Sequence, residues 1–379
     1  MPTGDRRGMP PPPTAPDQGV AWHYGDPLRE QRLLAQGRGA VDLSHWSVLE
    51  VAGEDRIAFL DSLTSQRLTG IVPPESRLTL LLSPHGHVEY VLRVVATPHS
   101  LLLIIDESAA PPRGIDESAA PPRGIDESAA PPRRTAADLH AYLQSMVFLS
   151  RVTITDRTEE NAVVFEPTCQ PDPLLPTALV VEEFSGRPVP DRGRSAGGDP
   201  ARYVPHRPAL LIGREVILPR GDLPARLGAE PAGTWALEAL RIAAGIPRLG
   251  LDTDDRTLPH EVGWVGPAVH LEKGCYRGQE TVARVHNLGR PPRRLVLLHC
   301  DGSHGDLPQW RDAITADGAV VGSVGSVVQH YELGPLALGL VKAGTVADGD
   351  RVSAGGVPAT VESIVVAERS ATRPRPPRG

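Results

Sequence analysis

The most informative stretch of this sequence is Lys273-Gly274-Cys275-Tyr276-Arg277-Gly278-Gln279-Glu280. It places one cysteine between two cationic residues, and such neighbours stabilise the thiolate, which is the nucleophilic and metal-binding form of cysteine. The two glycines permit a tight turn and close approach of a ligand to the backbone. The last two residues of the stretch are predicted to begin a helix. Because most lone cysteines are small buried hydrophobic residues, the stretch alone leaves a structural role for Cys275 open.

Length and composition favour a globular protein with more than one domain. The chain has 379 residues, of which 40% are hydrophobic, enough for two or three domains with buried cores. Its 39 Lys and Arg residues against 46 Asp and Glu residues give a net charge of −7, so no overall positive field attracts nucleic acid or an anionic membrane. No apolar run approaches the roughly 20 residues that span a bilayer, and no signal-peptide pattern is present. We therefore expect a cytoplasmic protein with no direct nucleic-acid or membrane partner.

The cysteines and lysines are few. Cys169, Cys275 and Cys300 show neither a disulfide framework nor the spacing of a zinc site, so no metal site is predicted. Lys273 and Lys342 are the only lysines in a chain whose other basic residues are arginines. A lysine that persists in such a composition is a candidate for a position that needs lysine.

Three segments have low-complexity or Pro-rich composition. Residues 1–21 contain a run of prolines and are predicted to form a disordered leader without chemistry, and residues 370–379 are predicted to form a disordered tail. A decapeptide, Ile-Asp-Glu-Ser-Ala-Ala-Pro-Pro-Arg-Gly, begins at Ile105, Ile115 and Ile125, and its last copy ends in Arg134. Because this unit is too short for a solenoid repeat, residues 105–134 are interpreted as an expanded, structurally dispensable loop.

Apolar patterns elsewhere indicate an α+β protein. Strands are predicted near residues 48–51, 77–82, 87–95, 152–154 and 162–165, and helices after Gly53, after Thr135 and over 234–244. Thr135 and Asp138 resemble a capping box. A Pro/Arg cluster at residues 290–294 predicts a domain boundary, and the short strand candidates of residues 291–369 predict a small β-barrel.

A family resemblance rests on the segment from Lys273 to Gly289, which reads K-G-C-Y-R-G-Q-E-T-V-A-R-V-H-N-L-G. This segment resembles the signature of YgfZ-type folate-binding proteins, in the glycine-cleavage T-protein superfamily, at every specified position. The segments Asp42 to His45, Gly53 to Leu60, Leu63 to Gln66 and Leu240 to Pro247 also resemble that family. The similar segments extend from about residue 22 to about residue 369.

The resemblance implies two interleaved α+β domains over residues 22–290 and a C-terminal β-barrel over 291–369, arranged as a ring around a central cavity. It implies tetrahydrofolate, or a derivative, as the cofactor in that cavity. It also implies a non-catalytic accessory role in the assembly or repair of iron–sulfur enzymes, including tRNA-modifying ones, which would be transient partners.

The resemblance also assigns the site residues. Lys273 and Cys275 become the functional pair, and the cofactor-binding residues are Tyr276, Gln279, Glu280 and Arg284. A cationic rim would attract the anionic tail of folate, and an apolar cleft would accept its ring. Trp264 or Tyr276 is a candidate to stack on that ring, although Trp264 fits a core aromatic residue as well.

A rival hypothesis is folate-dependent one-carbon transfer of the aminomethyltransferase kind. T-proteins carry a carboxylate after the Gly-containing hairpin, where this chain places Tyr90 or Val91, although a one-residue shift of the alignment would bring Glu89 there. They carry a second carboxylate where this chain has Ala243. Loss of a general acid or base costs roughly 10²–10⁴-fold in rate, so these departures favour the accessory role.

Overall fold

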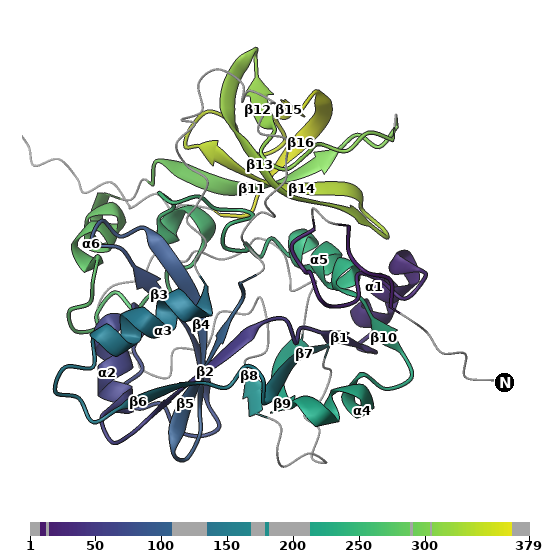
Figure 1. The fold of residues 1–379 in the computed structure, drawn as a ribbon. Coiled ribbons are helices and arrows are strands. Elements are labelled where there is room, and N and C mark those ends of the chain that lie inside the picture. Colours follow the sequence, from purple (N-terminus) through teal and green to yellow (C-terminus); the bar gives the residue numbers. More distant parts are fainter. Residues whose placement is uncertain are drawn as a thin grey trace, which may run out of the picture.

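The computed structural model describes residues 8–12, 15–107, 135–167, 179–181, 213–288, 291–303 and 305–365. These residues form two five-stranded sheets and one closed six-stranded barrel, with helices on the flanks (Figure 1). The predicted class, α+β with a C-terminal β-barrel, is confirmed. In Figure 1 the barrel lies above the two sheets, and the three units surround the middle of the molecule.

The first sheet has the strand order β10-β1-β7-β9-β8, in which only the β1–β10 pair is parallel. Its strands are β1 (Ala40–Asp42), β7 (Asn161–Pro167), β8 (Leu179–Val181), β9 (Gly213–Pro219) and β10 (Pro231–Ala232). The second sheet is inserted in the chain between β1 and β7, so the two units are interleaved as predicted.

The second sheet is antiparallel throughout, in the order β3-β4-β5-β2-β6. Its strands are β2 (Ser47–Ala52), β3 (Ser76–Leu82), β4 (Val88–Ala96), β5 (Ser100–Ile105) and β6 (Thr153–Asp156). Every residue of β5 is buried, because Leu101 and Leu103 face one core while Leu102 and Ile104 face another. This two-sided burial explains why the β5 sequence is a continuous apolar run instead of an alternating one.

The C-terminal barrel closes in the order β11-β14-β13-β12-β15-β16. Its strands are β11 (Arg293–Cys300), β12 (Ala313–Ala316), β13 (Ala319–His330), β14 (Gly334–Lys342), β15 (Arg351–Ala354) and β16 (Val357–Ser363). The strand predictions found all of these except β12.

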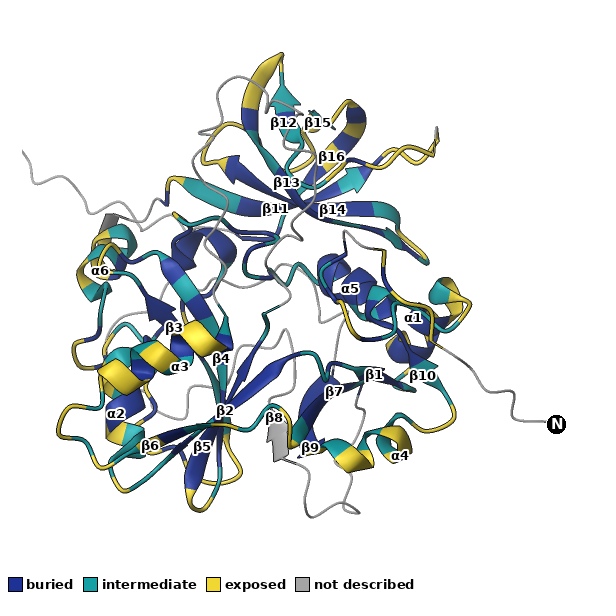
Figure 2. Ribbon diagram, in the orientation of Figure 1, coloured by how far each residue is buried: buried dark blue, intermediate teal, exposed yellow. Residues whose placement is uncertain are grey.

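The helices are short. They are α1 (Pro27–Ala35), α2 (Arg56–Leu63), α3 (Ala136–Ser145), α4 (Leu223–Leu227), α5 (Thr234–Ala243) and α6 (Gln279–Leu288), with 3₁₀ turns at Arg220–Asp222 and Pro259–Val262. Helix α5 is almost wholly buried (Figure 2), because Ala236 and Leu240 face the first sheet while Ala239 and Ile242 face the core beneath the barrel. It therefore joins the barrel to the sheets.

No helix among the described residues combines the length and the apolar character needed to span a membrane.

The predicted disordered leader is corrected in part by the structure. Met9 bridges to His23, and Asp17 is 1% exposed and paired with Arg248 and His45. Composition alone missed this, because the segment has few apolar residues and is held by a buried ion pair. Residues 1–7, 13–14 and the predicted tail lie outside the described residues.

The boundary of the predicted repeat loop is also corrected. The first copy begins inside β5, where Ile105 is buried, and Asp106 pairs with Arg248 at 2.6 Å. Glu107 accepts a hydrogen bond from the Ser47 hydroxyl. The first three residues of the repeat therefore belong to the fold, and residues 108–134 lie outside the described part of the chain.

Deletion of residues 108–127 removes two complete ten-residue units and leaves Ile105, Asp106 and Glu107 in one intact copy. We expect the free energy of unfolding to stay unchanged or to rise by up to about 1 kcal/mol, because loop-closure entropy changes by only about 0.6 kcal/mol per doubling of length. Chemical denaturation of the two proteins measures this difference. A clear loss of stability on deletion would show that the repeats make structural contacts of their own.

Candidate functional site

The signature segment forms the loop before α6 and continues into that helix, whose predicted start at Gln279 is confirmed. Tyr276 is buried in the core beneath the barrel, together with Leu82, Val262 and Leu295. Burial raises the pKa of its hydroxyl to about 12. Tyr276 is thus a core residue, and its burial holds the signature segment against the rest of the protein.

Lys273 is also buried, with a side chain only 1% exposed. Its ammonium donates hydrogen bonds to the carbonyl oxygens of Asp61, Thr64 and Gln66, at and just beyond the end of α2. Burial lowers the pKa of this amine, and the Asp61 carboxylate 3.5 Å away opposes that shift. The ammonium of Lys273, which was predicted to act together with the Cys275 thiol, is therefore bound to backbone carbonyl groups.

Cys275 is exposed and forms no disulfide. Cys300 is its opposite, because it lies inside the barrel and burial raises the pKa of its thiol to about 11. Cys169 lies outside the described residues. Cys275 is the accessible thiol of the described part of the chain.

A cavity lies between the two sheets and is closed on one side by α5. It is lined by Trp46, Tyr90, Val91, Arg93, Ile105, Asp106, Phe165, Glu215, Leu237, Glu238, Arg241, Ile246, Pro247, Arg248, Leu249 and Trp264. Aromatic and aliphatic side chains predominate, with a few charged groups, which is the composition typical of small-molecule sites. No residue of the described barrel strands is among them.

Each charged group named in the cavity wall has a partner. Arg93 pairs with Glu215 at 2.7 Å, joining β4 of one sheet to β9 of the other, and its guanidinium lies 4.7 Å from the Trp46 ring centroid. Trp46 is 6% exposed, and its indole N–H has no hydrogen-bond acceptor within the described ranges. A buried donor of this kind on a cavity wall favours a ligand that offers an acceptor.

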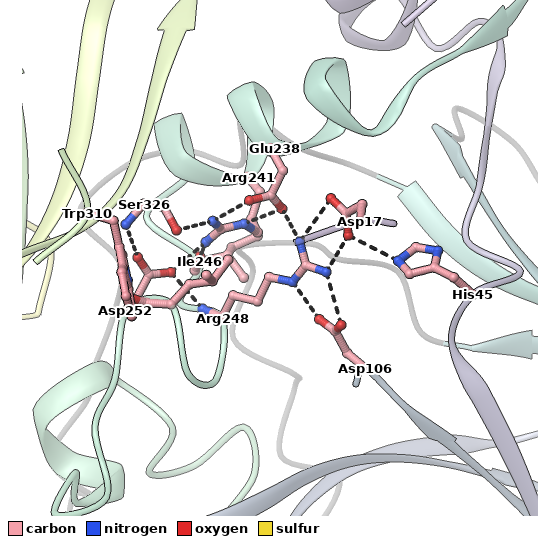
Figure 3. Close-up of polar contacts among 11 residues, drawn as sticks. Asp17, His45, Asp106, Glu238, Arg241, Ile246, Arg248, Asp252, Trp310 and Ser326 are labelled. Atoms are coloured by element: carbon pink, nitrogen blue, oxygen red, sulfur yellow. Dashed lines mark hydrogen bonds and ion pairs between the residues drawn. The ribbon is translucent and has the colours of Figure 1, made fainter. Parts of the chain in front are cut away.

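Four lining residues, Asp106, Glu238, Arg241 and Arg248, belong to a buried network of polar and charged side chains, which we call the arginine network (Figure 3). Its members are Asp17, His45, Asp106, Glu238, Arg241, Arg248, Asp252 and Ser326. It connects the N-terminal segment, the residue after β5, α5, the loop after α5 and barrel strand β13.

Arg248 is the centre of the network. It lies 2.6 Å from Asp17, 2.6 Å from Asp106 and 3.2 Å from Glu238. Burial opposes its charge, but these carboxylates hold the pKa of Arg248 well above its ordinary value. Burial alone would raise the pKa of Asp17, yet Arg248 and His45 bring it well below its ordinary value.

The predicted site residues lie away from this cavity. Neither the pair Lys273 and Cys275 nor any of Tyr276, Gln279, Glu280 and Arg284 lines it, and their role in a folate site stays a prediction. Tyr276 is in the core, and Glu280 and Arg284 are exposed on α6. A sequence signature identifies a segment, but the direction of each side chain depends on how that segment packs.

The cavity residues that sequence reasoning missed lie beside segments that carry the resemblance. Trp46 directly follows Asp42 to His45, and Arg248 directly follows Leu240 to Pro247. Arg241 stands within the second of these segments. Trp264 belongs to the core and also lines the cavity, so its stacking on a ligand stays a prediction.

The positions compared with T-proteins are also resolved in space. Tyr90 and Val91 both lie on the cavity wall, and Ala243 is fully buried in the core. Glu89 is paired with Arg277 at 3.4 Å. At these alignment positions the cavity therefore has a phenol and an isopropyl group where a carboxylate is expected.

His260 gives the site region a pH dependence. Burial, and then the nearby His286, lower its pKa from 6.5 to about 4. Below pH 6.5 the unfolded chain therefore takes up a proton that the folded chain does not, so stability falls as the pH falls. At pH 5 we expect a loss of about 2 kcal/mol relative to pH 7 from this group. Urea denaturation of wild type and His260→Gln at pH 5 and pH 7 measures this loss. If the free energy of unfolding changes equally with pH in the two proteins, His260 is not the group responsible.

Comparisons with known proteins were made on the sequence and on the fold. No family model matches the sequence. An aminomethyltransferase of Nostoc sp. is 24% identical over 343 residues, which is 83% of this chain and 79% of the relative. A putative chloroplastic transferase of Arabidopsis thaliana is 23% identical, covering 89% of this chain and 73% of the relative. An aminomethyltransferase of Herpetosiphon aurantiacus is 33% identical over 149 residues, but the match spans only 40% of that protein.

Among solved structures, the glycine cleavage system aminomethyltransferase T from Bartonella henselae matches with a TM-score of 0.63. It is 18% identical, and the match covers 91% of each chain. This chain has the aminomethyltransferase T fold. Together with the distant sequence relatives, the fold supports a place in the aminomethyltransferase-like superfamily.

Proposed function

We propose that this protein is a YgfZ-type accessory factor that binds tetrahydrofolate, or a derivative, in the central cavity and uses Cys275 to support iron–sulfur enzymes. Its clients would include enzymes that modify tRNA, and the contact would be transient. The observation that carries this proposal is the exposure of Cys275 in a segment that Lys273, Tyr276 and Arg277 tie to the fold.

Four residues near Cys275 have structural partners. Lys273 binds backbone carbonyls, Tyr276 packs in the core, and Gln279 donates a hydrogen bond to the Lys273 carbonyl at 3.3 Å. Arg277 pairs with Glu89 and lies over the Tyr142 ring. An exposed thiol gives the fold little burial energy, so its place in this rigid segment favours a contact with a partner. One cysteine cannot hold a cluster that takes four ligands, so ligation would be shared.

The cavity fits a pterin-type ligand. Trp46, Trp264 and Phe165 offer aromatic surface, and the buried Trp46 N–H would donate to a ring nitrogen or carbonyl of the ligand. Arg93 holds the Trp46 ring from one side. The chain's contribution would be to orient the ligand between the two sheets and to shield it from water.

A one-carbon transferase is the second candidate, favoured by the names of the relatives and by carboxylates in the cavity wall. Asp106, Glu215 and Glu238 are all paired with arginines. Each of these carboxylates is thus engaged in an ion pair within the fold. The positions where T-proteins carry acids are occupied here by Tyr90 or Val91 and by Ala243, which favours the accessory role.

The accessory role is tested by complementation of a strain that lacks its own member of the family, scored by the activity of an iron–sulfur enzyme. We expect Cys275→Ala to lose rescue while remaining folded, and Cys300→Ala, which removes the buried thiol, to retain it. Full rescue by Cys275→Ala would refute the role of the thiol.

Cofactor binding is tested separately by titration with tetrahydrofolate. We expect Trp46→Phe, which keeps the aromatic face but removes the N–H donor, to weaken binding by roughly 5–30-fold, corresponding to a hydrogen bond worth about 1–2 kcal/mol. Unchanged affinity would remove Trp46 from the site. Formation of methylene-tetrahydrofolate from candidate amines, at a rate unaffected by Cys275→Ala, would instead favour the transferase.

A further inference from the structure

The ammonium of Lys273 lies in a cage made by the backbone of another segment. Three carbonyl oxygens converge on it, those of Asp61, Thr64 and Gln66, the last two at 2.7 and 3.1 Å. The Tyr276 ring lies 5.4 Å away on the motif side. Carbonyl oxygens arranged around one buried charge are the ligands that a monovalent cation takes in proteins.

The end of α2 explains why a cation is needed there. The last carbonyl groups of a helix have no partner within the helix and form its negative end. Thr64 ends α2 by donating its N–H to Leu60, while the Asp61 and Thr64 carbonyls point to Lys273. A cation at this position satisfies those groups and balances the dipole.

The cage also explains why this residue is a lysine in a chain that otherwise uses arginine. An ammonium is compact and has three rotatable donors, one for each of the three oxygens. A guanidinium is planar and donates from a rigid fork. Arginine at position 273 would therefore leave at least one carbonyl without a donor.

Further contacts join the same two segments. Ser65 donates its hydroxyl to the Ala268 carbonyl at 2.7 Å and accepts the His270 N–H at its own carbonyl at 3.0 Å. Arg67 donates to the Glu272 carbonyl at 2.9 Å. Lys273 supplies the buried charge in this contact between residues 61–67 and residues 268–273, and it lies two residues before the exposed thiol of Cys275.

We propose that Lys273 is a positioning residue. Its ammonium occupies a cage of backbone oxygens that would otherwise suit a monovalent cation, and it thereby holds the loop that contains Cys275. The importance of that loop rests on the proposed function, but the cage itself does not. Removal of the ammonium would leave a vacant site for a small cation of similar size, such as ammonium or potassium ion.

The test is thermal unfolding of Lys273→Ala in choline, sodium, potassium and ammonium chloride at equal ionic strength. We expect the variant to unfold several degrees below wild type in choline chloride, and ammonium or potassium to restore about half of that loss. Lys342→Ala, which changes the other lysine, on the barrel surface, is the matched control and should show no preference among the four salts. Lys273→Arg should also lose stability, without recovery by any of the salts.

Two outcomes would overturn the proposal. The first is a Lys273→Ala variant with the same midpoint in all four salts, and the second is a Lys273→Arg variant as stable as wild type. If Lys273→Ala does not fold, Lys273→Met keeps the apolar stem and is measured in its place. Failure of complementation by a Cys275 variant bears on the proposed function, whereas the salt dependence bears on the cage alone.

Discussion

Arg248→Met should lower the free energy of unfolding by about 3–5 kcal/mol. The substitution keeps the length and apolar stem of the side chain but removes a charge that Asp17, Asp106 and Glu238 share. Asp17 keeps its contact with His45 and Glu238 keeps its contact with Arg241, while Asp106 loses the cation that lies 2.6 Å away. A buried carboxylate without a counter-charge is costly, whereas the intact pair contributes little by itself.

The matched control is Arg38→Met. Arg38 forms an ion pair with Glu230 at the same 2.6 Å, but the two side chains are 55% and 35% exposed. Exposed pairs contribute about 0–1 kcal/mol, so this variant should stay close to wild type in chemical denaturation. If the two arginine variants cost the same, the arginine network does not hold the segments together.

A double variant tests the reason for the loss. Adding Asp106→Asn to Arg248→Met removes one of the carboxylate charges that faced the lost guanidinium, so the double variant should be more stable than the sum of the two single effects predicts. Purely additive effects would show that the cost comes from lost packing instead of from unpaired charge.

Sequence reasoning could not find this network, because its members are far apart in the chain. Arg248 meets Asp17 across 231 positions and Asp106 across 142. One acid lies in a segment with the composition of a disordered leader, and the other lies in a repeat with the composition of a loop. Long-range ion pairs leave no periodic pattern, so composition gave the wrong prediction at both places.

Local patterns were more reliable, because short-range physics determines them. The Thr135 and Asp138 capping box is present with both hydrogen bonds, and α3 follows it. The helix predicted after Gly53 is α2, and Asp55 is its N-cap residue, although the Asp55 carboxylate binds Arg151 instead of the helix. Strand β12 was missed because Ala313–Ala316 is four residues long, with a single large apolar side chain, Ile314.

The resemblance assigned the residues of the signature segment to a cofactor site, and that assignment stays a prediction. The structure adds that Lys273 and Tyr276 hold the segment to α2 and to the core. The cavity instead takes its residues from β4, β5, β9 and α5, which meet only after the two sheets pack together. That meeting depends on tertiary packing, which a single sequence does not reveal.

The two glycines of the segment give a direct test of this structural role. Gly278 has φ +82°, and a Cβ atom added there would lie 2.5 Å from the Ser83 carbonyl oxygen and 2.9 Å from the Gly86 Cα. The β3–β4 turn thus lies against the start of α6, with glycine on both sides of the contact. Gly278→Ala should cost about 2–4 kcal/mol of unfolding free energy, from the left-handed backbone and the backbone clash together.

Gly274→Ala is the matched control within the same segment. A Cβ at Gly274 would meet nothing within 4 Å, and its backbone is not left-handed, so this variant should unfold within about 0.5 kcal/mol of wild type. Chemical denaturation of both variants measures the contrast. If Gly278→Ala is as stable as Gly274→Ala, the turn can move away from α6 without cost. If the contrast holds, the reason for Gly278 is the close approach of two backbones, and a ligand is not needed to explain it.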